Sequence, residues 1–345
     1  MLIRLGCLRN AVFSLPAPQF AKHGKKGYTM PFSERILQPE AIFVDIRFQS
    51  GGAAAWKADI ALLFVCREDA PAACCPELAE AAPWFTIAPG LRDFRGDKEE
   101  RLLLHGLPDL PLPRLLITGL GPRNECTLDV FRLATAGAVR RCKELRTNSI
   151  LLPAPNLDRL PGGGPRLLEE AVFAACIGLY NGKKWQLRKD EEKPDPEWLA
   201  LGFTESFVPD DARVRARRGE RGACGLALAR DLVNTPPNLL SPAALAARAE
   251  ELAARHTMRC EVLDKAQIKA QGMGALLAVG AGSANEPRLV VLEYCPQGCE
   301  DQKPLTLVGK GLCFDSGGLS LKPAQNMHHM KGDMGGAAAI LGALE

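Results

Sequence analysis

The sequence lacks any apolar run of roughly 18 to 20 residues, which is the length that a membrane-spanning helix requires. Its net charge is only +3 over 345 residues. This small excess gives no reason to expect nucleic acid or an anionic membrane as the main partner.

The 12 cysteines include no CxxC pair and no Cys/His zinc spacing. We read them as reduced thiols of a reducing compartment, mostly small core residues, with a disulfide framework as the weaker alternative.

Acidic residues are absent from residues 1–33, whereas Arg4, Arg9, Lys22, Lys25 and Lys26 are basic. We expect residues 1–35 to be a disordered basic leader. The opening MLIRLGCLRNAVFSL could also form a basic amphipathic helix, as a mitochondrial transit peptide does. A cytoplasmic location is therefore our expectation, and a mitochondrial one is the alternative.

The length of the chain suits two α/β domains, because 345 residues exceed one average domain. Short runs rich in Val, Ile, Leu and Phe alternate with stretches whose apolar residues have helical spacing. This alternation predicts a mixed or parallel sheet with helices on its faces. We predict an N-terminal α/β domain over residues 36–182, with strands at Asp59–Cys66 and Leu115–Gly119. The helix Leu167–Leu179 is expected to turn Glu169 and Glu170 toward solvent.

The charge-rich stretch KKWQLRKDEEKPDPEW predicts a solvated linker over residues 183–209. A second α/β domain is expected over residues 210–345. Within it, Ser241 has the character of a helix N-cap, with Pro242 at the first helical position. Leu305–Val308 reads as a short strand that leads directly into the glycine-rich segment at the end of the chain.

That final segment, VGKGLCFDSGGLSLKPAQNMHHMKGDMGGAAA, carries Lys310, Asp315, Lys322 and Asp333. Asp315 and Asp333 are oxygen ligands that suit divalent metals, and two metals a short distance apart can hold and deprotonate a water between them. Lysine binds metal only when it is neutral, and burial beside cations makes a neutral Lys310 accessible. A charged Lys322 would instead bind a substrate carbonyl and stabilise the developing oxyanion.

Each of these residues taken alone would more often be a solvated surface side chain, so the hypothesis depends on the whole pattern. His328 and His329 are weak candidates for metal ligands, because adjacent residues of a helix do not face the same way and no HExxH motif occurs. Met330 could line an apolar pocket beside the metals or could be a plain core methionine.

The motifs VGKG, FDSGG, LSLKP and NMHHMKGDMGGAAA, together with ARDLVNTPPNLLSP upstream, resemble the leucine aminopeptidase (cytosol aminopeptidase) family of two-metal exopeptidases. The resemblance implies a non-catalytic N-terminal α/β domain and a C-terminal catalytic α/β domain. By motif position it implies that Lys310, Asp315 and Asp333 are metal ligands, that Lys322 is the catalytic lysine, and that Met330 lines the pocket for the first side chain. Lys322 would also contact substrate.

The same resemblance implies two divalent metal ions, Mn²⁺ or Zn²⁺ with Mg²⁺ or Co²⁺ as alternatives, peptide substrates with a leucine-like first residue, and a homo-hexamer. The family's later NTDxEGR motif, which supplies further ligands, has no counterpart here. We therefore expect a C-terminally truncated member whose catalytic domain is present only in part. Two functions follow from this: a metal-dependent aminopeptidase, or a catalytically inactive homologue that acts as a structural or interaction protein.

Overall fold

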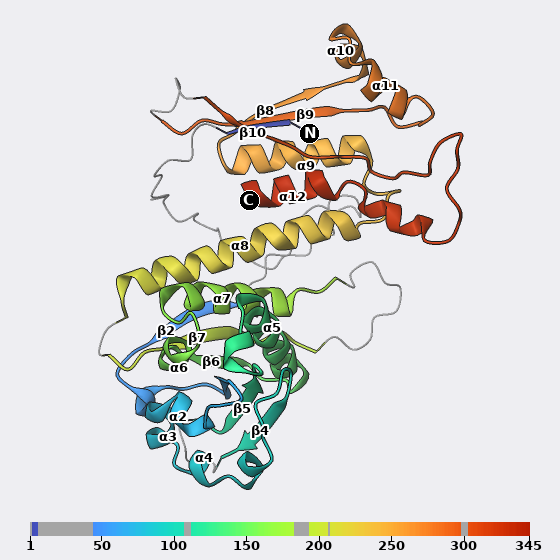
Figure 1. Cartoon of the computed structure of the whole chain (residues 1–345). Coiled ribbons are helices and arrows are strands. Elements are labelled where there is room, and N and C mark those ends of the chain that lie inside the picture. The colour runs from blue at the N-terminus through green and yellow to red at the C-terminus, as the bar shows by residue number, and fades with distance from the viewer. Residues whose placement is uncertain (1, 6–43, 107–111, 183–192, 206–207, 298–302) are drawn as a thin grey trace, which may run out of the picture. The chain divides into compact units, whose positions relative to one another are not determined.

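A computed structural model of the chain describes residues 2–5, 44–106, 112–182, 193–205, 208–297 and 303–345 (Figure 1). The chain divides into two compact units. The first consists of Met1–Pro39 with Gly225–Glu345, and the second is the continuous segment Glu40–Cys224. The boundary between them falls within helix α8 (Asp210–Asn234), 14 to 15 residues later than the start at residue 210 that the sequence suggested.

The unit Glu40–Cys224 is built on a six-stranded sheet with the order β2-β7-β6-β3-β5-β4. All neighbouring strands run parallel except β4, which is antiparallel to β5. The sheet is thus mixed, as the alternation of strands and helices predicts. Its strands are β2 (Asp45–Gln49), β3 (Ile60–Val65), β4 (Arg101–His105), β5 (Arg114–Gly119), β6 (Ser149–Pro153) and β7 (Trp198–Gly202).

Both faces of this sheet are covered, because alternate side chains of the central strand β3 enter different cores. Ile60, Leu62 and Phe64 pack in one cluster with residues of α5 (Leu128–Glu144) and α7 (Pro165–Leu179). Ala61, Leu63 and Val65 pack on the other face, where the helices are α2 (Pro71–Cys74), α3 (Pro76–Ala81) and α4 (Trp84–Ile87). A strand buried on both faces is expected to be a continuous apolar run, and IALLFV is one.

Two expectations for this unit differ from the structure. Residues 198–202 fall within the stretch 183–209 that we expected as a linker, yet they form β7, which pairs with both β2 and β6. The short apolar run WLALG was obscured by the charges that precede it. Glu170 does not face solvent: it is buried, and it accepts hydrogen bonds from Arg132 Nε and Nη2 at 2.7 and 2.9 Å. A bidentate guanidinium makes that burial tolerable.

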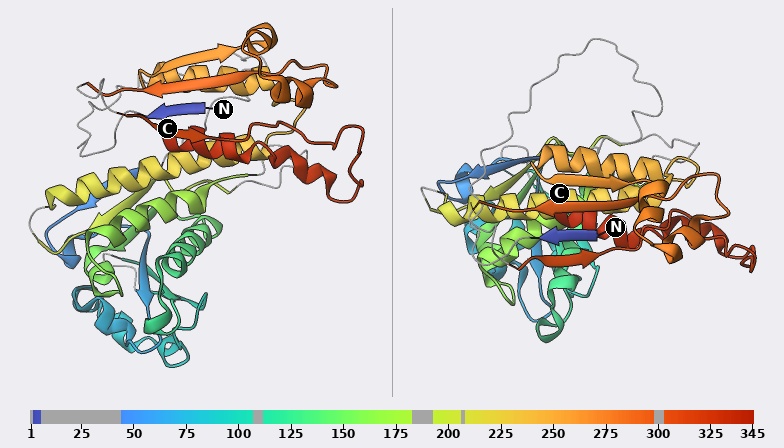
Figure 2. Two further views of the ribbon diagram at one scale, coloured as in Figure 1. Left: turned by 45° about the horizontal axis from the view of Figure 1, so that its top comes forward. Right: turned by 90° about the horizontal axis from the view of Figure 1, so that it is seen from above.

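The other unit contains a four-stranded sheet with the order β10-β1-β9-β8, which Figure 2 shows from above. Its strands are β1 (Leu2–Leu5), β8 (Arg259–Leu263), β9 (Leu289–Tyr294) and β10 (Leu305–Val308). Residues 2–5 were expected to belong to a disordered leader, but they form a central strand. The rest of that expectation, residues 6–35, lies outside the described part of the chain.

Helices α9 (Pro242–Arg255) and α12 (Gly335–Leu344) pack against this sheet in one apolar core, in which Leu245, Leu252, Leu292 and Leu341 are buried. The start of α9 is the one that the sequence predicts. The Ser241 side chain accepts a hydrogen bond from the Ala244 N–H, and Pro242 follows at the first helical position. The short helices α10 (Lys265–Ala270) and α11 (Gly274–Gly280) connect β8 to β9.

Candidate metal centre

The candidate centre begins where β10 ends. A Cβ on Gly309 would lie only 2.6 Å from the Gly336 carbonyl oxygen, so a glycine is required for the strand end to approach the start of α12. The same approach allows the Ala337 N–H to donate to the Lys310 carbonyl at 2.8 Å. The backbone of Lys310 is therefore fixed between the strand and the helix.

The loop that follows brings Asp315 and Lys322 together. Gly317 has a φ of 95°, a conformation that favours glycine, and its N–H donates to Asp315 Oδ1 at 2.9 Å. The Lys322 N–H closes the loop by donating to the Ser316 carbonyl at 2.9 Å. As a result, Lys322 Nζ donates to Asp315 Oδ2 at 2.7 Å.

A short 3₁₀ helix, η4 (Met327–Gly332), supplies the remaining groups. It is entered through Asn326 in the left-handed conformation, with a φ of 64°. Met330 Sδ lies 3.1 Å from Lys322 Nζ, and the Asp333 N–H donates to the Met330 carbonyl at 3.2 Å. The structure thus brings together all five residues that the sequence singled out.

Two lysine–aspartate pairs form the centre: Lys322 with Asp315, and Lys310 Nζ with Asp333 Oδ1 at 2.7 Å. The two pairs belong to one electrostatic site. The hydrogen bond from Lys322 and that from the Gly317 N–H lower the pKa of Asp315, and the charge of Lys310 adds to the effect. Both carboxylates accordingly lie beside a positive charge, which is the environment that a bound cation would also provide.

One atom of the centre lacks a partner. Asp333 Oδ2 is buried and makes no hydrogen bond, and a buried unpaired acceptor is costly unless another group satisfies it. Two carboxylates and a lysine amine, with one carboxylate oxygen unused, fit the donor preference of a divalent cation. Within the described residues no group of three or more His, Cys, Asp or Glu side chains could hold a metal. The candidate donors that come together here are Lys310, Asp315 and Asp333.

Lys310 differs from the expectation in one respect. We expected burial to favour its neutral form, but its side chain is 59% exposed and is paired with Asp333. A cation at this position would therefore have to compete with the proton for the amine. The glycines that place Lys310 were recognisable in the sequence, whereas its exposure was not.

The structure adds one residue, Lys331, that the sequence analysis did not consider, and it shows where the two adjacent histidines lie. Lys331 Nζ donates to the Asn234 carbonyl at 3.3 Å and so ties η4 to the end of α8. His328 and His329 are exposed, and their rings contact each other with centroids 4.1 Å apart. No motif marks Lys331, since a single lysine beside a glycine has no distinctive pattern.

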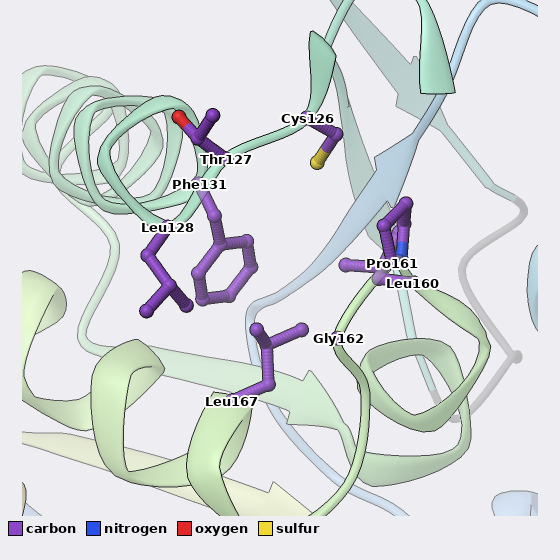
Figure 3. A pocket seen from close by; sticks show the side chains of 8 residues that line it. All are labelled: Cys126, Thr127, Leu128, Phe131, Leu160, Pro161, Gly162 and Leu167. Atoms are coloured by element: carbon purple, nitrogen blue, oxygen red, sulfur yellow. The ribbon is translucent and has the colours of Figure 1, made fainter. Parts of the chain in front are cut away.

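A cavity of about 180 Å³ lies elsewhere, in the unit Glu40–Cys224 (Figure 3). It is lined by Cys126, Thr127, Leu128, Phe131, Leu160, Pro161, Gly162 and Leu167. In Figure 3 the side chains of Phe131 and Leu167 point toward each other across it. None of the five residues of the candidate centre lines this cavity, so its apolar walls belong to the packing between α5 and the loop after α6 (Ala154–Arg159).

Comparison with known proteins identifies the family to which these motifs belong. The model for the catalytic domain of the cytosol aminopeptidase family matches residues 227–345, which include the whole candidate centre. The model for the N-terminal domain of the same family matches residues 84–185. The chain belongs to the cytosol aminopeptidase family. The resemblance noted in the sequence is thereby confirmed.

The relatives within the family are considerably longer than this chain. A probable cytosol aminopeptidase of Desulfovibrio desulfuricans is 50% identical over 301 residues, covering 87% of this chain and 60% of the relative. One from Nitratidesulfovibrio vulgaris is 48% identical over 303 residues, with the same shares. The chain therefore spans about three fifths of the length of these relatives.

Solved structures agree on the α/β fold. The bottromycin maturation enzyme BotP in complex with Mn is 32% identical, with a TM-score of 0.62 over 83% of this chain and 55% of that one. A mutant of tomato leucine aminopeptidase has a TM-score of 0.69 over 89% of this chain and 60% of that one. At 24% identity this second likeness shows the fold alone.

Among the described residues, no helix is both long and apolar enough to span a membrane.

Proposed function

We propose that this chain carries part of the metal centre of an aminopeptidase that releases N-terminal residues, preferably leucine-like ones, from peptides. The observation that carries the proposal is the convergence of Lys310, Asp315, Lys322 and Asp333 in one site, with Asp333 Oδ2 buried and unpaired. Membership in the cytosol aminopeptidase family supports the reaction class. The Mn named for BotP supports the choice of a divalent metal, with two Mn²⁺ or Zn²⁺ ions as our assignment.

The chain's own residues divide into metal-holding and substrate-holding groups. Lys310, Asp315 and Asp333 would hold the metals. When bound, a divalent cation supplies a water of lowered pKa and polarises a carbonyl. Hydrogen bonds from Lys322 and from the Gly317 N–H, together with the charge of Lys310, lower the pKa of Asp315, so its carboxylate would be available as a charged ligand.

Lys322 is the group that we assign to the substrate. Its ammonium has three N–H donors, and two of them face Asp315 Oδ2 and Met330 Sδ. The remaining donor is available for the oxygen of the scissile carbonyl, on which negative charge develops as water attacks. Met330, whose Sδ lies 3.1 Å from Lys322 Nζ, would form the wall beside the first side chain of the peptide.

Titration of the full chain with Mn²⁺, followed by calorimetry and by the Mn²⁺ electron paramagnetic resonance signal, tests the metal assignment. We expect binding by the unchanged chain and loss of at least tenfold in affinity for both Asp315→Asn and Asp333→Asn, because each substitution removes a charged ligand. Lys322→Ala should leave binding intact. Glu125→Gln, which removes the exposed partner of Lys98 in the other unit, is the matched control.

The outcomes separate the roles. Loss of Mn²⁺ binding in Lys322→Ala would show that Lys322 is a ligand and not a catalytic group. Equal binding by the two aspartate variants and the unchanged chain would refute the metal centre. That result would favour the second candidate, a non-catalytic structural or interaction protein, for which the small donor set among the described residues is the supporting observation.

Two further assignments rest on the relatives. We propose a cytoplasmic location, since the relatives are named cytosol aminopeptidases, and none of them supports the mitochondrial alternative. We also propose peptide substrates and a homo-oligomer, which by the family resemblance is a hexamer. The proposed domain organisation is the one outlined from the sequence, except that residues 2–5 form β1 and residues 198–202 form β7.

A further inference from the structure

The cavity in the unit Glu40–Cys224 lies at the carboxyl edge of the six-stranded sheet. One of its walls, residues 126–128, follows the carboxyl end of β5, and the other, residues 160–162, follows β6 and α6. Both β5 and β6 are parallel to β3, which lies between them in the sheet. The cavity is therefore placed beyond the carboxyl ends of three neighbouring parallel strands.

The chain changes from one face of the sheet to the other at this edge. After β3 it continues into α2, which packs on the face that buries Leu63 and Val65. After β5 it continues into α5, which packs on the opposite face with Leu62 and Phe64. In open α/β sheets, ligands bind outside the carboxyl ends of the strands at such a switch point, where diverging connections leave a crevice. The cavity thus occupies the position at which this architecture favours a ligand site.

The loops around the cavity are tied to one another through Arg123. Its backbone N–H donates to Glu68 Oε2 at 2.9 Å, and its guanidinium donates to Asp69 Oδ2 at 2.7 Å and to the Arg159 carbonyl at 3.4 Å. These hydrogen bonds connect the loops that follow β3 and β5 to the end of α6. A ligand would therefore find walls that are already in place, which reduces the entropy lost on binding.

The interior of the cavity is apolar, and it reaches the surface. Phe131, Leu160 and Leu167 are buried, whereas Thr127 and Gly162 are exposed. A charged group in such an interior would lose its hydration without gaining a partner. The volume of about 180 Å³ is slightly larger than that of an apolar cavity of about 150 Å³ that binds benzene. The cavity therefore suits an uncharged molecule of about the size of one aromatic ring.

Two groups on the wall favour an aromatic ring. In Figure 3 the sulfur of Cys126 and the ring of Phe131 point into the same space. The Cys66 thiol donates a hydrogen bond to Cys126 Sγ, and the Phe131 ring packs edge-on against Phe64 with centroids 5.2 Å apart. Both groups are thus held in position. A polarisable sulfur and an aromatic ring each make favourable contacts with a second ring.

We propose that this cavity is a binding site for a small uncharged aromatic molecule, which contacts Cys126 Sγ and the Phe131 ring and packs against Leu167. None of the residues of the candidate metal centre lines it. The inference goes beyond the proposed function and does not depend on it, so failure of Mn²⁺ binding would refute that function and leave this site unaffected.

Calorimetric titration of the full chain with benzene tests the site. We expect a dissociation constant on the order of 1 mM. Leu128→Phe should weaken benzene binding by about tenfold or more, because the larger side chain enters the cavity from its wall. Leu133→Phe makes the same change on the exposed side of α5 and is the matched control. Benzoate, which adds a negative charge to the ring, should bind the unchanged chain about tenfold more weakly or less.

Protection of the Cys126 thiol tests the site without any substitution. Alkylation by iodoacetamide is followed by peptide mapping at one alkaline pH, because burial raises the pKa of this thiol. We expect benzene at about ten times its dissociation constant to slow the alkylation of Cys126 by about tenfold. Cys295, an exposed cysteine of the other unit, is the internal reference and should react at an unchanged rate.

Several results would overturn the proposal. No benzene binding together with no protection of Cys126 would show that the cavity is only a packing defect. Equal slowing at Cys126 and Cys295 would assign the effect to the solvent, and equal affinity of Leu128→Phe and Leu133→Phe, both folded by urea unfolding, would place benzene elsewhere. Benzoate that binds as tightly as benzene would refute the assignment to an uncharged ligand.

Discussion

At the scale of single residues, the chain holds its charged groups and its thiols in opposite environments. The four charged residues of the candidate centre are partly exposed and paired, whereas Cys75, Cys142 and Cys176 are buried in the cores of the unit Glu40–Cys224. Burial raises the pKa of each of these thiols from 9.0 to about 12. They therefore stay protonated in the folded protein, in agreement with their role as small core residues.

This shift predicts a loss of stability at alkaline pH. A raised folded pKa contributes stability that is complete below the unfolded value of 9.0 and is lost as the pH rises toward 12. At pH 10 each buried thiol should reduce the free energy of unfolding by about 1.4 kcal/mol relative to pH 8. Urea unfolding at the two pH values measures this loss of unfolding free energy. In Cys142→Ala the loss between pH 8 and pH 10 should be smaller by the contribution of one thiol, about 1.4 kcal/mol. An identical pH dependence in this variant would contradict the prediction.

At the scale of elements, close helix contacts depend on glycine. In the unit Gly225–Glu345, a Cβ on Gly225 of α8 would lie 2.1 Å from the Gly342 carbonyl oxygen, and one on Gly342 of α12 would lie 2.4 Å from the Gly225 carbonyl oxygen. Such contacts force a backbone shift, so the two helices cannot keep their distance if either residue is replaced.

We therefore expect Gly342→Ala to destabilise the protein by about 1 to 3 kcal/mol, despite the better helix propensity of alanine. Thermal or urea unfolding of the variant measures the effect. Gly335→Ala, in the first turn of the same helix, is the matched control, because a Cβ there would meet only Val233 Cγ2 at 3.9 Å. Equal stability of Gly342→Ala and the unchanged protein would show that α8 and α12 are free to separate.

The N-cap of α9 gives a second prediction at this scale. The Ser241 side chain accepts from the Ala244 N–H at 3.2 Å and satisfies one of the free donors of the helix start. Ser241→Ala should cost about 1 kcal/mol of stability, and Ser241→Asp should retain most of it. Chemical unfolding of the three proteins side by side distinguishes the cap from a general effect of substitution, since a cap requires that aspartate perform better than alanine.

Elements with a local signal were the ones that the sequence predicted. Ser241 and Pro242 mark the start of α9, and the apolar runs of β3 and β5 mark buried strands. In contrast, β1 and β7 have four and five residues and lie within charged or basic surroundings. Their pairing depends on partners far away in the sequence, so local composition could not reveal it. Likewise, the motif identified the residues of the candidate centre but not the pairing of Lys322 with Asp315 or the exposure of Lys310.

At the scale of the whole molecule, the proposed function gives the centre few protein donors. The described residues bring two carboxylates and one lysine to the centre. Zinc takes about four ligands, and Mn²⁺ or Mg²⁺ takes about six, so under the proposed function these three donors would leave most positions around two metals to water or to further groups. An incompletely held metal pair would position a water poorly, and small errors in geometry reduce catalysis strongly.

We therefore expect the 345-residue chain alone to bind Mn²⁺ but to hydrolyse a leucine anilide slowly or not at all. Release of the amine, followed with and without Mn²⁺, measures the hydrolysis. Lys322→Ala is the control for background. Turnover that requires Mn²⁺ and disappears in Lys322→Ala would show that the three donors, with water, suffice for catalysis. In that case the two carboxylates and Lys310 would suffice as protein ligands, and the amine of Lys310 would have to lose its proton to solvent before it could bind a metal. Slow turnover that is unchanged in Lys322→Ala would instead assign the remaining activity to Mn²⁺ in solution. Robust metal binding without turnover is the combination that the geometry favours, because Asp333 Oδ2 is ready to accept a cation while too few donors hold the reacting water in place.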